Sequence, residues 1–256
     1  MLSVVIIAKN EADRIEAAIC SVAFADEVVV VDSGSTDDTV ARAEALGARV
    51  VCTDWPGFVA QKNRAWCTAK GDWVLSLDAD ERVSPELAAS IQRAVQGPAR
   101  GFWVARRNIY LGTPLRGGHW YPDARVRLAR RDRARWVGEN PHDRLEVDGP
   151  VAWLDGDLLH EPYRSFAEHL HTIDHYAAVA ATALLAKGRR ARPWDILVRP
   201  LWRVFAEFVL QGGWRDGALG LRLALLAGVY TELKWCRVAG KITLSEAPGD
   251  RGAPSA

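Results

Sequence analysis

Short apolar runs alternate with segments of helical periodicity along the first hundred residues. Four runs have the length and β-branched character of strands that are buried on both faces of a parallel sheet. They are residues 3–8, 27–31, 49–52 and 73–77. Helices are predicted between these runs at residues 15–22, 39–46 and 58–69. This alternation predicts an α/β fold, built from parallel βαβ units with helices on both faces of the sheet.

Polar residues follow three of these strands directly: Asn10 and Glu11, then Asp32, then Asp78 and Asp80. Open α/β sheets bind their ligands beyond the carboxyl ends of the strands. The two aspartates after the fourth strand suit a hard divalent cation, Mg²⁺ or Mn²⁺, that takes further ligands from a phosphate and water. The alternative is a solvated acidic turn, and for the other residues helix capping. Neither G-x-G-x-x-G nor a phosphate-binding loop motif occurs.

The next segment is rich in arginine and in predicted strands. A helix follows Ser84 to about residue 95, and strands are predicted at residues 102–107, 124–130 and 151–154. The arginines clustered between residues 106 and 135 are Arg106, Arg107, Arg116, Arg125, Arg127, Arg130, Arg131, Arg133 and Arg135. A solvated strand face is the simpler interpretation for most of them. A cluster this dense would also suit a phosphorylated acceptor, because arginine contacts phosphate in a bidentate manner.

The C-terminal part is helical and strongly amphipathic. A capping box at Ser165 opens a helix to about residue 186, and residues 188–192 form a basic break. In residues 194–211 polar side chains recur at every fourth position, and residues 219–230 form a second apolar helix. These helices either pack on the sheet domain or attach to an anionic membrane surface through tryptophans and arginines. The tryptophans are Trp194, Trp202, Trp214 and Trp235.

Composition limits the classes of function and compartment. The 256 residues are 49% hydrophobic and 25% charged, which is typical of a globular protein, and the net charge of +1 argues against nonspecific nucleic-acid binding. The four scattered cysteines resemble buried apolar residues in a reducing compartment. Neither a signal peptide nor an uncharged stretch of about 20 apolar residues is found. A cytoplasmic protein is therefore expected, peripheral at the inner face of the cytoplasmic membrane.

Four motifs in this order and spacing resemble the nucleotide-sugar-binding half of glycosyltransferase family 2. They are S-V-V-I-I-A-K-N-E, V-V-V-D-S-G-S-T-D-D-T, Q-K-N-R-A and L-D-A-D-E, and the resemblance covers residues 1–83 strongly. It implies a GT-A fold, a divalent metal and inversion at the anomeric carbon. The A-K-N-E form, where the family often has Pro-Thr or Pro-Val, is similar to lipopolysaccharide-core β-1,4-glucosyltransferases.

The resemblance also implies roles for individual residues. Nucleotide-sugar binding would fall to Ala8, Asn10, Glu11, Asp32, Lys62 and Asp78, and the metal to Asp78, Asp80 and His160. A loop carboxylate would take the acceptor's proton, with Asp143 as first choice and Glu139 as second, and His142 would position the acceptor. Turn capping is the alternative for these loop residues, and a core or surface histidine is the alternative for His160.

The expected organisation is a GT-A domain over residues 1–163, a helical region over 164–245 and a disordered tail over 246–256. Within the domain, residues 1–100 would bind the nucleotide sugar and 101–163 the acceptor. The expected function is transfer of a hexose, most simply glucose from UDP-glucose, to a lipopolysaccharide-core or other lipid-linked acceptor. The alternatives are a nucleotidyltransferase of similar architecture and a noncatalytic membrane-associated binder of nucleotide sugars.

Overall fold

The computed structural model describes residues 1–138 and 143–240, which form two compact units. The first unit contains Met1–Arg107 and Asp123–Pro162. The second contains Asn108–Pro122 and, within the described chain, residues 163–240. The predicted tail at 246–256 lies outside the described residues.

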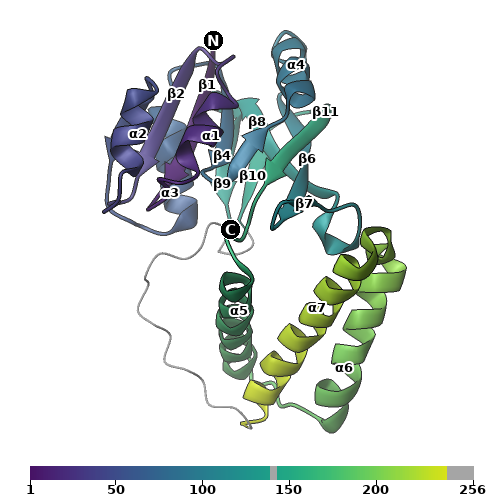
Figure 1. Cartoon of the computed structure of the whole chain (residues 1–256). Coiled ribbons are helices and arrows are strands. Elements are labelled where there is room, and N and C mark those ends of the chain that lie inside the picture. Colours follow the sequence, from purple (N-terminus) through teal and green to yellow (C-terminus); the bar gives the residue numbers. More distant parts are fainter. Residues whose placement is uncertain (139–142, 241–256) are drawn as a thin grey trace. The chain divides into compact units, whose positions relative to one another are not determined.

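The first unit is built on one mixed sheet with its parallel strands at one side (Figure 1). The parallel strands, in the spatial order β3-β2-β1-β4, are β1 (Leu2–Ala8), β2 (Glu27–Asp32), β3 (Arg49–Cys52) and β4 (Trp73–Asp78). The sheet continues through β8 (Asp123–Arg130), β6 (Gly101–Tyr110), β11 (Val151–His160) and β5 (Glu81–Val83). β8 runs antiparallel to β4 and to β6. The predicted α/β class, with a parallel first half, is confirmed.

Helices cover both faces of this sheet. Successive side chains of a strand point to opposite faces, so each strand contributes to two apolar cores. Val4 and Ile6 of β1 pack toward α1 (Ile15–Cys20), α2 (Thr39–Ala45) and α4 (Pro85–Ala94). Val5 packs toward α3 (Phe58–Thr68) and toward Trp136 and Leu145. The latter two belong to β9 (Ala134–Val137) and β10 (Arg144–Val147), an antiparallel pair that sequence analysis did not predict.

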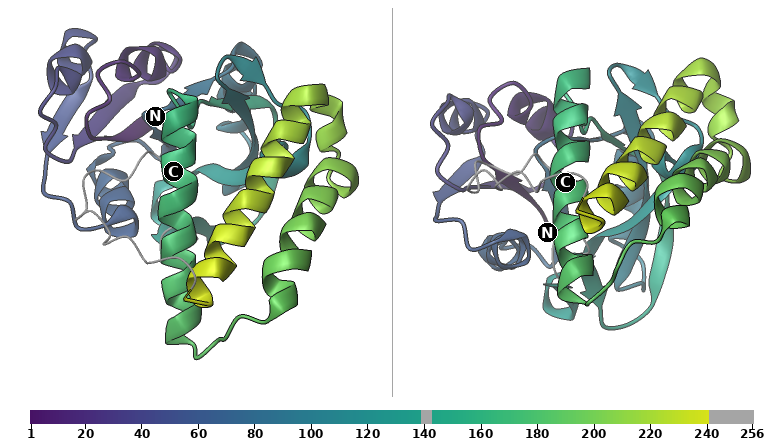
Figure 2. Two further views of the ribbon diagram at one scale, coloured as in Figure 1. Left: turned by 60° about the horizontal axis from the view of Figure 1, so that its bottom comes forward. Right: turned by 90° about the horizontal axis from the view of Figure 1, so that it is seen from below.

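The described part of the second unit contains three long helices. They are α5 (Phe166–Ala186), α6 (Pro193–Phe205) and α7 (Gly217–Val238), and a π-helical segment, Ala206–Leu210, continues α6. α7 lies between α5 and α6 in all views and packs against both (Figure 2). Ser165 caps α5 as predicted, since its hydroxyl accepts a hydrogen bond from the backbone N–H of Glu168. Among the described residues, no helix combines the length and the apolar character needed to cross a membrane.

The segment Asn108–Pro122, assigned from sequence to the acceptor half, packs with these helices instead. It includes β7 (Thr113–Pro114), which pairs with the end of β6. Leu115 is buried in one apolar cluster with Leu223 of α7. The Asp216 carboxylate accepts hydrogen bonds from the backbone N–H groups of Arg116 and Gly117 at 2.8 and 3.0 Å. A chain segment that is distant in sequence thus completes the helical unit.

Candidate active site

The end of β4 places two carboxylates in the interior of the first unit. All six residues of β4 are buried between β1 and β8, and Asp78 is the last of them. Asp80 follows after one residue, before β5, and both aspartates are buried. The backbone N–H of Asp78 donates to Oε2 of Glu81 at 3.0 Å, which fixes the turn between β4 and β5. Glu81 is fully buried, and sequence analysis assigned it no role.

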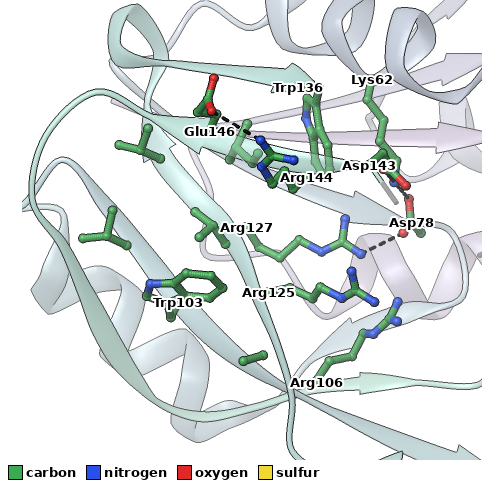
Figure 3. A pocket seen from close by; sticks show the side chains of 15 residues that line it. Lys62, Asp78, Trp103, Arg106, Arg125, Arg127, Trp136, Asp143, Arg144 and Glu146 are labelled. Atoms are coloured by element: carbon green, nitrogen blue, oxygen red, sulfur yellow. Dashed lines mark hydrogen bonds and ion pairs between the residues drawn. The ribbon is translucent and has the colours of Figure 1, made fainter. Parts of the chain in front are cut away.

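Two buried arginines, Arg106 and Arg127, bind Glu81, and Figure 3 shows the contact of Arg127 with Asp78. Arg127 Nη2 donates to Asp78 Oδ2 at 2.8 Å and to Glu81 Oε1 at 2.6 Å. Arg106 Nη1 donates to the same Glu81 oxygen at 3.2 Å, and its Nη2 donates to Asp123 at 2.6 Å. The prediction that most of the arginines lie on a solvated strand face is therefore wrong for Arg106 and Arg127. Their burial depends on carboxylates that lie tens of residues away in the chain.

The opposite charges in this network keep one another ionised. Burial alone would raise the pKa of Asp78, but the positive charges of Lys62 and Arg127 outweigh it and hold that pKa well below its usual range. Burial alone would lower the pKa of Arg127, but Glu81 and Asp78 raise it above its usual value. Asp78 therefore stays ionised between two cations. A divalent cation at Asp78 would face both, so the geometry does not favour this residue as a metal ligand.

Asp80 and His160 form a separate pair. His160 Nε2 lies 3.2 Å from Asp80 Oδ2, and Arg14 Nη1 lies 3.9 Å from the same oxygen. β11 brings His160 here, because it pairs with β5 so that His160 is opposite Glu81. Among the described residues, no group of three or more His, Cys, Asp or Glu side chains could hold a metal by itself. The Asp80 carboxylate suits a divalent ion that takes other ligands from a phosphate and water, and the imidazole adds a nitrogen ligand of the kind that transition metals accept.

The first two strands bring the predicted nucleotide-binding residues to one edge. Ala8 and Asp32 are register partners at the ends of β1 and β2. Asn10 has a left-handed backbone conformation with φ of 57°, which asparagine tolerates better than most residues. Its Oδ1 accepts a hydrogen bond from the backbone N–H of Thr36 at 2.8 Å. The backbone N–H of Glu11 donates to Thr39 Oγ1 at 2.8 Å, so the turns after both strands are held together.

Lys62 links the end of β4 to the candidate base. It is buried on α3, with Nζ 2.8 Å from Asp143 Oδ2 and 3.5 Å from Asp78 Oδ1. The ammonium also lies over the indole of Trp136, 4.5 Å from the ring centroid. The structure thus brings together Lys62, Asp78 and Asp143, which are far apart in sequence. The other two residues predicted for the loop, Glu139 and His142, lie outside the described residues.

A cavity of about 510 Å³ opens beside this cluster, within the size range of small-molecule sites (Figure 3). Its walls include the indoles of Trp103 and Trp136 and side chains of opposite charge. The charged lining residues are Lys62, Asp78, Arg106, Arg125, Arg127, Asp143, Arg144 and Glu146. Sequence analysis assigned no role to Trp103, Trp136 or Glu146, since indoles and acids give no periodic signal that marks a cavity wall.

Comparison with known proteins assigns the family. A model of the family described as "Glycosyl transferase family 2" matches residues 3–145, more than half of the chain. This chain belongs to glycosyl transferase family 2. Membership makes the protein a glycosyltransferase and excludes the nucleotidyltransferase alternative. The family resemblance noted in the sequence is thereby confirmed.

Several relatives of this glycosyltransferase match most of its length. An uncharacterized glycosyltransferase from Rickettsia bellii (strain RML369-C) is 56% identical over 224 residues, which cover 82% of this chain and 76% of the relative. The lipopolysaccharide core biosynthesis glycosyltransferase LpsC of Rhizobium meliloti (strain 1021) is 28% identical and covers 96% of this chain and 95% of its own. A glucosyl-3-phosphoglycerate synthase from Mycobacterium tuberculosis, solved with Mn²⁺, UDP and glucosyl-3-phosphoglycerate, matches with a TM-score of 0.47 and 23% identity, covering 72% of this chain and 78% of that one.

Proposed function

We propose that this glycosyltransferase is a metal-dependent, inverting enzyme that moves a hexose onto a lipopolysaccharide-core or other lipid-linked glycan. UDP-glucose is the first donor to test. The observation that carries the proposal is the convergence of Lys62, Asp78 and Asp143 at one strand end, with Asp80 and His160 facing each other two residues further along. Similarity to LpsC along nearly the whole chain supports the choice of acceptor.

Asp80 and His160 would hold the divalent ion, Mg²⁺ or Mn²⁺. When bound, the ion acts as a Lewis acid that stabilises negative charge on the departing diphosphate, which contributes several kcal/mol to such reactions. Two ligands from the protein leave positions for phosphate oxygens and water. The 3.2 Å separation of carboxylate oxygen and imidazole nitrogen shows that the fold already brings both groups together.

Ala8, Asn10, Glu11 and Asp32 would line the nucleotide pocket. Asp32 Oδ2 already accepts hydrogen bonds from the backbone N–H groups of Gly34 and Ser35, and Oδ1 accepts one from the Ser35 hydroxyl. A carboxylate has about four acceptor sites, so Asp32 retains capacity for a ribose hydroxyl or a base N–H. The local hydrogen bonds would serve to orient this carboxylate.

Asp143 would act as the general base. The acceptor hydroxyl oxygen forms a bond to the anomeric carbon, the bond from that carbon to the diphosphate breaks, and the proton passes to Asp143. In the structure the ammonium of Lys62 donates a hydrogen bond to Oδ2 of Asp143 at 2.8 Å. We infer that the donor's diphosphate draws Lys62 away from Asp143. The same movement would neutralise the leaving group and free the base.

The cavity beside Asp143 would hold the acceptor sugar. Among the described residues, Arg127 Nε and Nη1 and Trp136 Nε1 are buried without a hydrogen-bond partner, and a hydroxyl-rich ligand could satisfy them. Net charge does not favour a phosphorylated acceptor, because the positive and negative groups in and directly behind the cavity wall balance. The five cations are Lys62, Arg106, Arg125, Arg127 and Arg144, and the five carboxylates are Asp78, Glu81, Asp123, Asp143 and Glu146.

A donor screen followed by a transfer assay tests the proposal. A nucleotide sugar that binds only the folded protein should raise its melting temperature, more so with Mn²⁺. Transfer from that donor to lipopolysaccharide core should then be lost in Asp143→Asn while donor binding persists. Asp148→Asn is the matched control, since that carboxylate is exposed in the turn after β10. Absence of both a donor shift and transfer would refute the proposal.

A further inference from the structure

α6 and the segment that continues it are turned so that their two carboxylates, Asp195 and Glu207, are buried and their apolar residues face outward. The polar residues recur at every fourth position of the sequence, and Asp195 and Glu207 among them are buried, at 4% and 1% exposure. Pro200, between them, is buried as well. On an ordinary surface helix the apolar stripe would face the core and the charges would face water. This helix has the opposite arrangement.

The exposed apolar stripe is continuous along α6 and beyond its end. Its members recur at intervals of three and four residues, so they lie on one helical face. They are Trp194, Leu197, Val198, Leu201, Trp202, Phe205 and Val209, with exposures from 45% to 71%. Leu210 and Trp214 extend the stripe toward the turn before α7, at 62% and 58% exposure. We call these nine residues the apolar stripe. Exposed apolar patches of this extent are rare on monomers and mark partner or membrane sites.

Buried polar contacts fix this orientation, so the exposure is built into the fold. Glu207 Oε1 accepts hydrogen bonds from the backbone N–H of His119 at 2.9 Å, and it lies 2.5 Å from His119 Nδ1. Arg203 reaches the other oxygen of Glu207 at 3.1 Å. Gly228 of α7 lets the two helices approach closely, because a Cβ there would meet the Val204 side chain at 2.6 Å. Rotating α6 to bury the stripe would remove these contacts.

The charges around the apolar stripe are overwhelmingly positive. Residues 187–222 contain eight basic and three acidic side chains, and two of the three acids are the buried Asp195 and Glu207. The exposed basic residues are Lys187, Arg189, Arg190, Arg192, Arg199, Arg215 and Arg222. Two of the tryptophans carry an arginine on their ring: Arg192 lies 5.6 Å from the Trp194 centroid, and Arg215 lies 5.6 Å from that of Trp214. Trp235 is different, since it is buried at 7% exposure, so the predicted interfacial role for it is wrong.

We infer that the apolar stripe docks on the surface of an anionic lipid bilayer. Leucines and tryptophans would enter the headgroup region, and the surrounding arginines would meet lipid phosphates. Attachment would be interfacial, since the described helices include none that could span. A second copy of the chain is a less favourable partner for the apolar stripe. If two stripes packed against each other, the exposed arginines around them would also come together and repel. The inference rests on surface geometry and charge, and it does not depend on the proposed function.

Vesicle flotation of the full-length protein tests the inference. Binding to vesicles of phosphatidylcholine with phosphatidylglycerol is expected at low salt, with weaker binding at high salt and on phosphatidylcholine alone. Each basic residue near an anionic surface changes the affinity about fivefold, so Arg189→Gln, Arg190→Gln and Arg192→Gln together should weaken binding about a hundredfold. Leu197→Ser with Leu201→Ser should also weaken it, and both side chains are exposed at 68% and 71%, so the fold should tolerate the change.

A matched triple variant controls for net charge. Arg131, Arg133 and Arg135 lie exposed in the first unit, and their replacement by glutamine removes the same charge without touching the stripe. This control should bind vesicles like the parent protein. Asp80→Asn should bind equally well, which separates docking from catalysis. The inference is overturned if the parent protein ignores anionic vesicles at low salt or if the control triple is as defective as the first. It is also overturned if Leu197→Ser with Leu201→Ser only dissociates a dimer in solution and leaves vesicle binding unchanged.

Discussion

Replacing Asp78 by asparagine should destabilise the first unit, because Asp78 pairs with both Lys62 and Arg127. The substitution keeps the shape of the side chain and removes its charge. Breaking a buried ion pair by removing one partner costs about 3–5 kcal/mol. Lys62 retains Asp143 at 2.8 Å and Arg127 retains Glu81 at 2.6 Å, so the lower end of this range applies. We expect a loss of about 3 kcal/mol in the free energy of unfolding.

Calorimetry of the parent and variant proteins measures this loss. For chains of this size about 1 kcal/mol corresponds to about 2–4 °C, so the unfolding transition of the first unit should fall by roughly 6–12 °C. Asp80→Asn is the comparison, because Arg14 lies 3.9 Å from the Asp80 carboxylate whereas Arg127 lies 2.8 Å from that of Asp78, so the loss in Asp80→Asn should be smaller. Equal melting of Asp78→Asn and the parent, or an equal loss in Asp80→Asn, would refute the reasoning.

A double-mutant cycle locates the cause. If the penalty arises from uncompensated positive charge, removal of Lys62 by Lys62→Met should cost less in the Asp78→Asn background than in the parent protein. Residues in one ion-pair network show coupling energies of about 0.5–3 kcal/mol. Strict additivity of the two losses would mean that Asp78 acts through packing alone.

Three further outcomes follow from the site and from the helical unit. Asp80→Asn, or chelation of divalent ions by EDTA, should abolish transfer, and full activity under either condition would contradict the metal-dependent mechanism. Asp143→Asn should reduce turnover severely with donor affinity near the parent value; if Glu139→Gln is inactive and Asp143→Asn is nearly normal, their roles must be exchanged. Burial, with the charge of His119, lowers the pKa of His169 to about 4. The unfolded chain takes up this proton near the usual value of about 6.5, so stability should fall as the pH drops from about 6.5 to 4. In urea melts, His169→Gln should flatten this dependence, whereas His171→Gln, at an exposed position of the same helix, should not.

The parallel half of the sheet could be predicted from sequence alone. Strands buried on both faces read as continuous apolar runs, and Gly, Ser and Asp residues mark their ends. The residues 49–52 were predicted with the bounds that β3 has, and β1, β2 and β4 differ by one residue at an end. The candidate site residues at these ends followed from the same pattern, since parallel strands must present their carboxyl ends at one edge.

The hairpin and the buried arginines could not be predicted in this way. Whether an arginine is solvated or buried depends on its partners, and Arg127 meets Asp78 across 49 positions of sequence. Trp136 becomes a cavity wall only because β9 and β10 pair and place it beneath Lys62. Such long-range pairing leaves no periodic signal in a short window of sequence.

The C-terminal helices show the same division most clearly. The sequence determined that α6 has one polar and one wide apolar face, because helical periodicity is a local property. It left open which face would be covered. The tertiary structure decided this. The Glu207 carboxylate contacts His119, which lies 88 positions away in sequence, and this contact turns the face that carries Glu207 inward. An apolar face is normally buried, but a buried carboxylate that is paired with His119 and Arg203 fixes the helix in the opposite orientation.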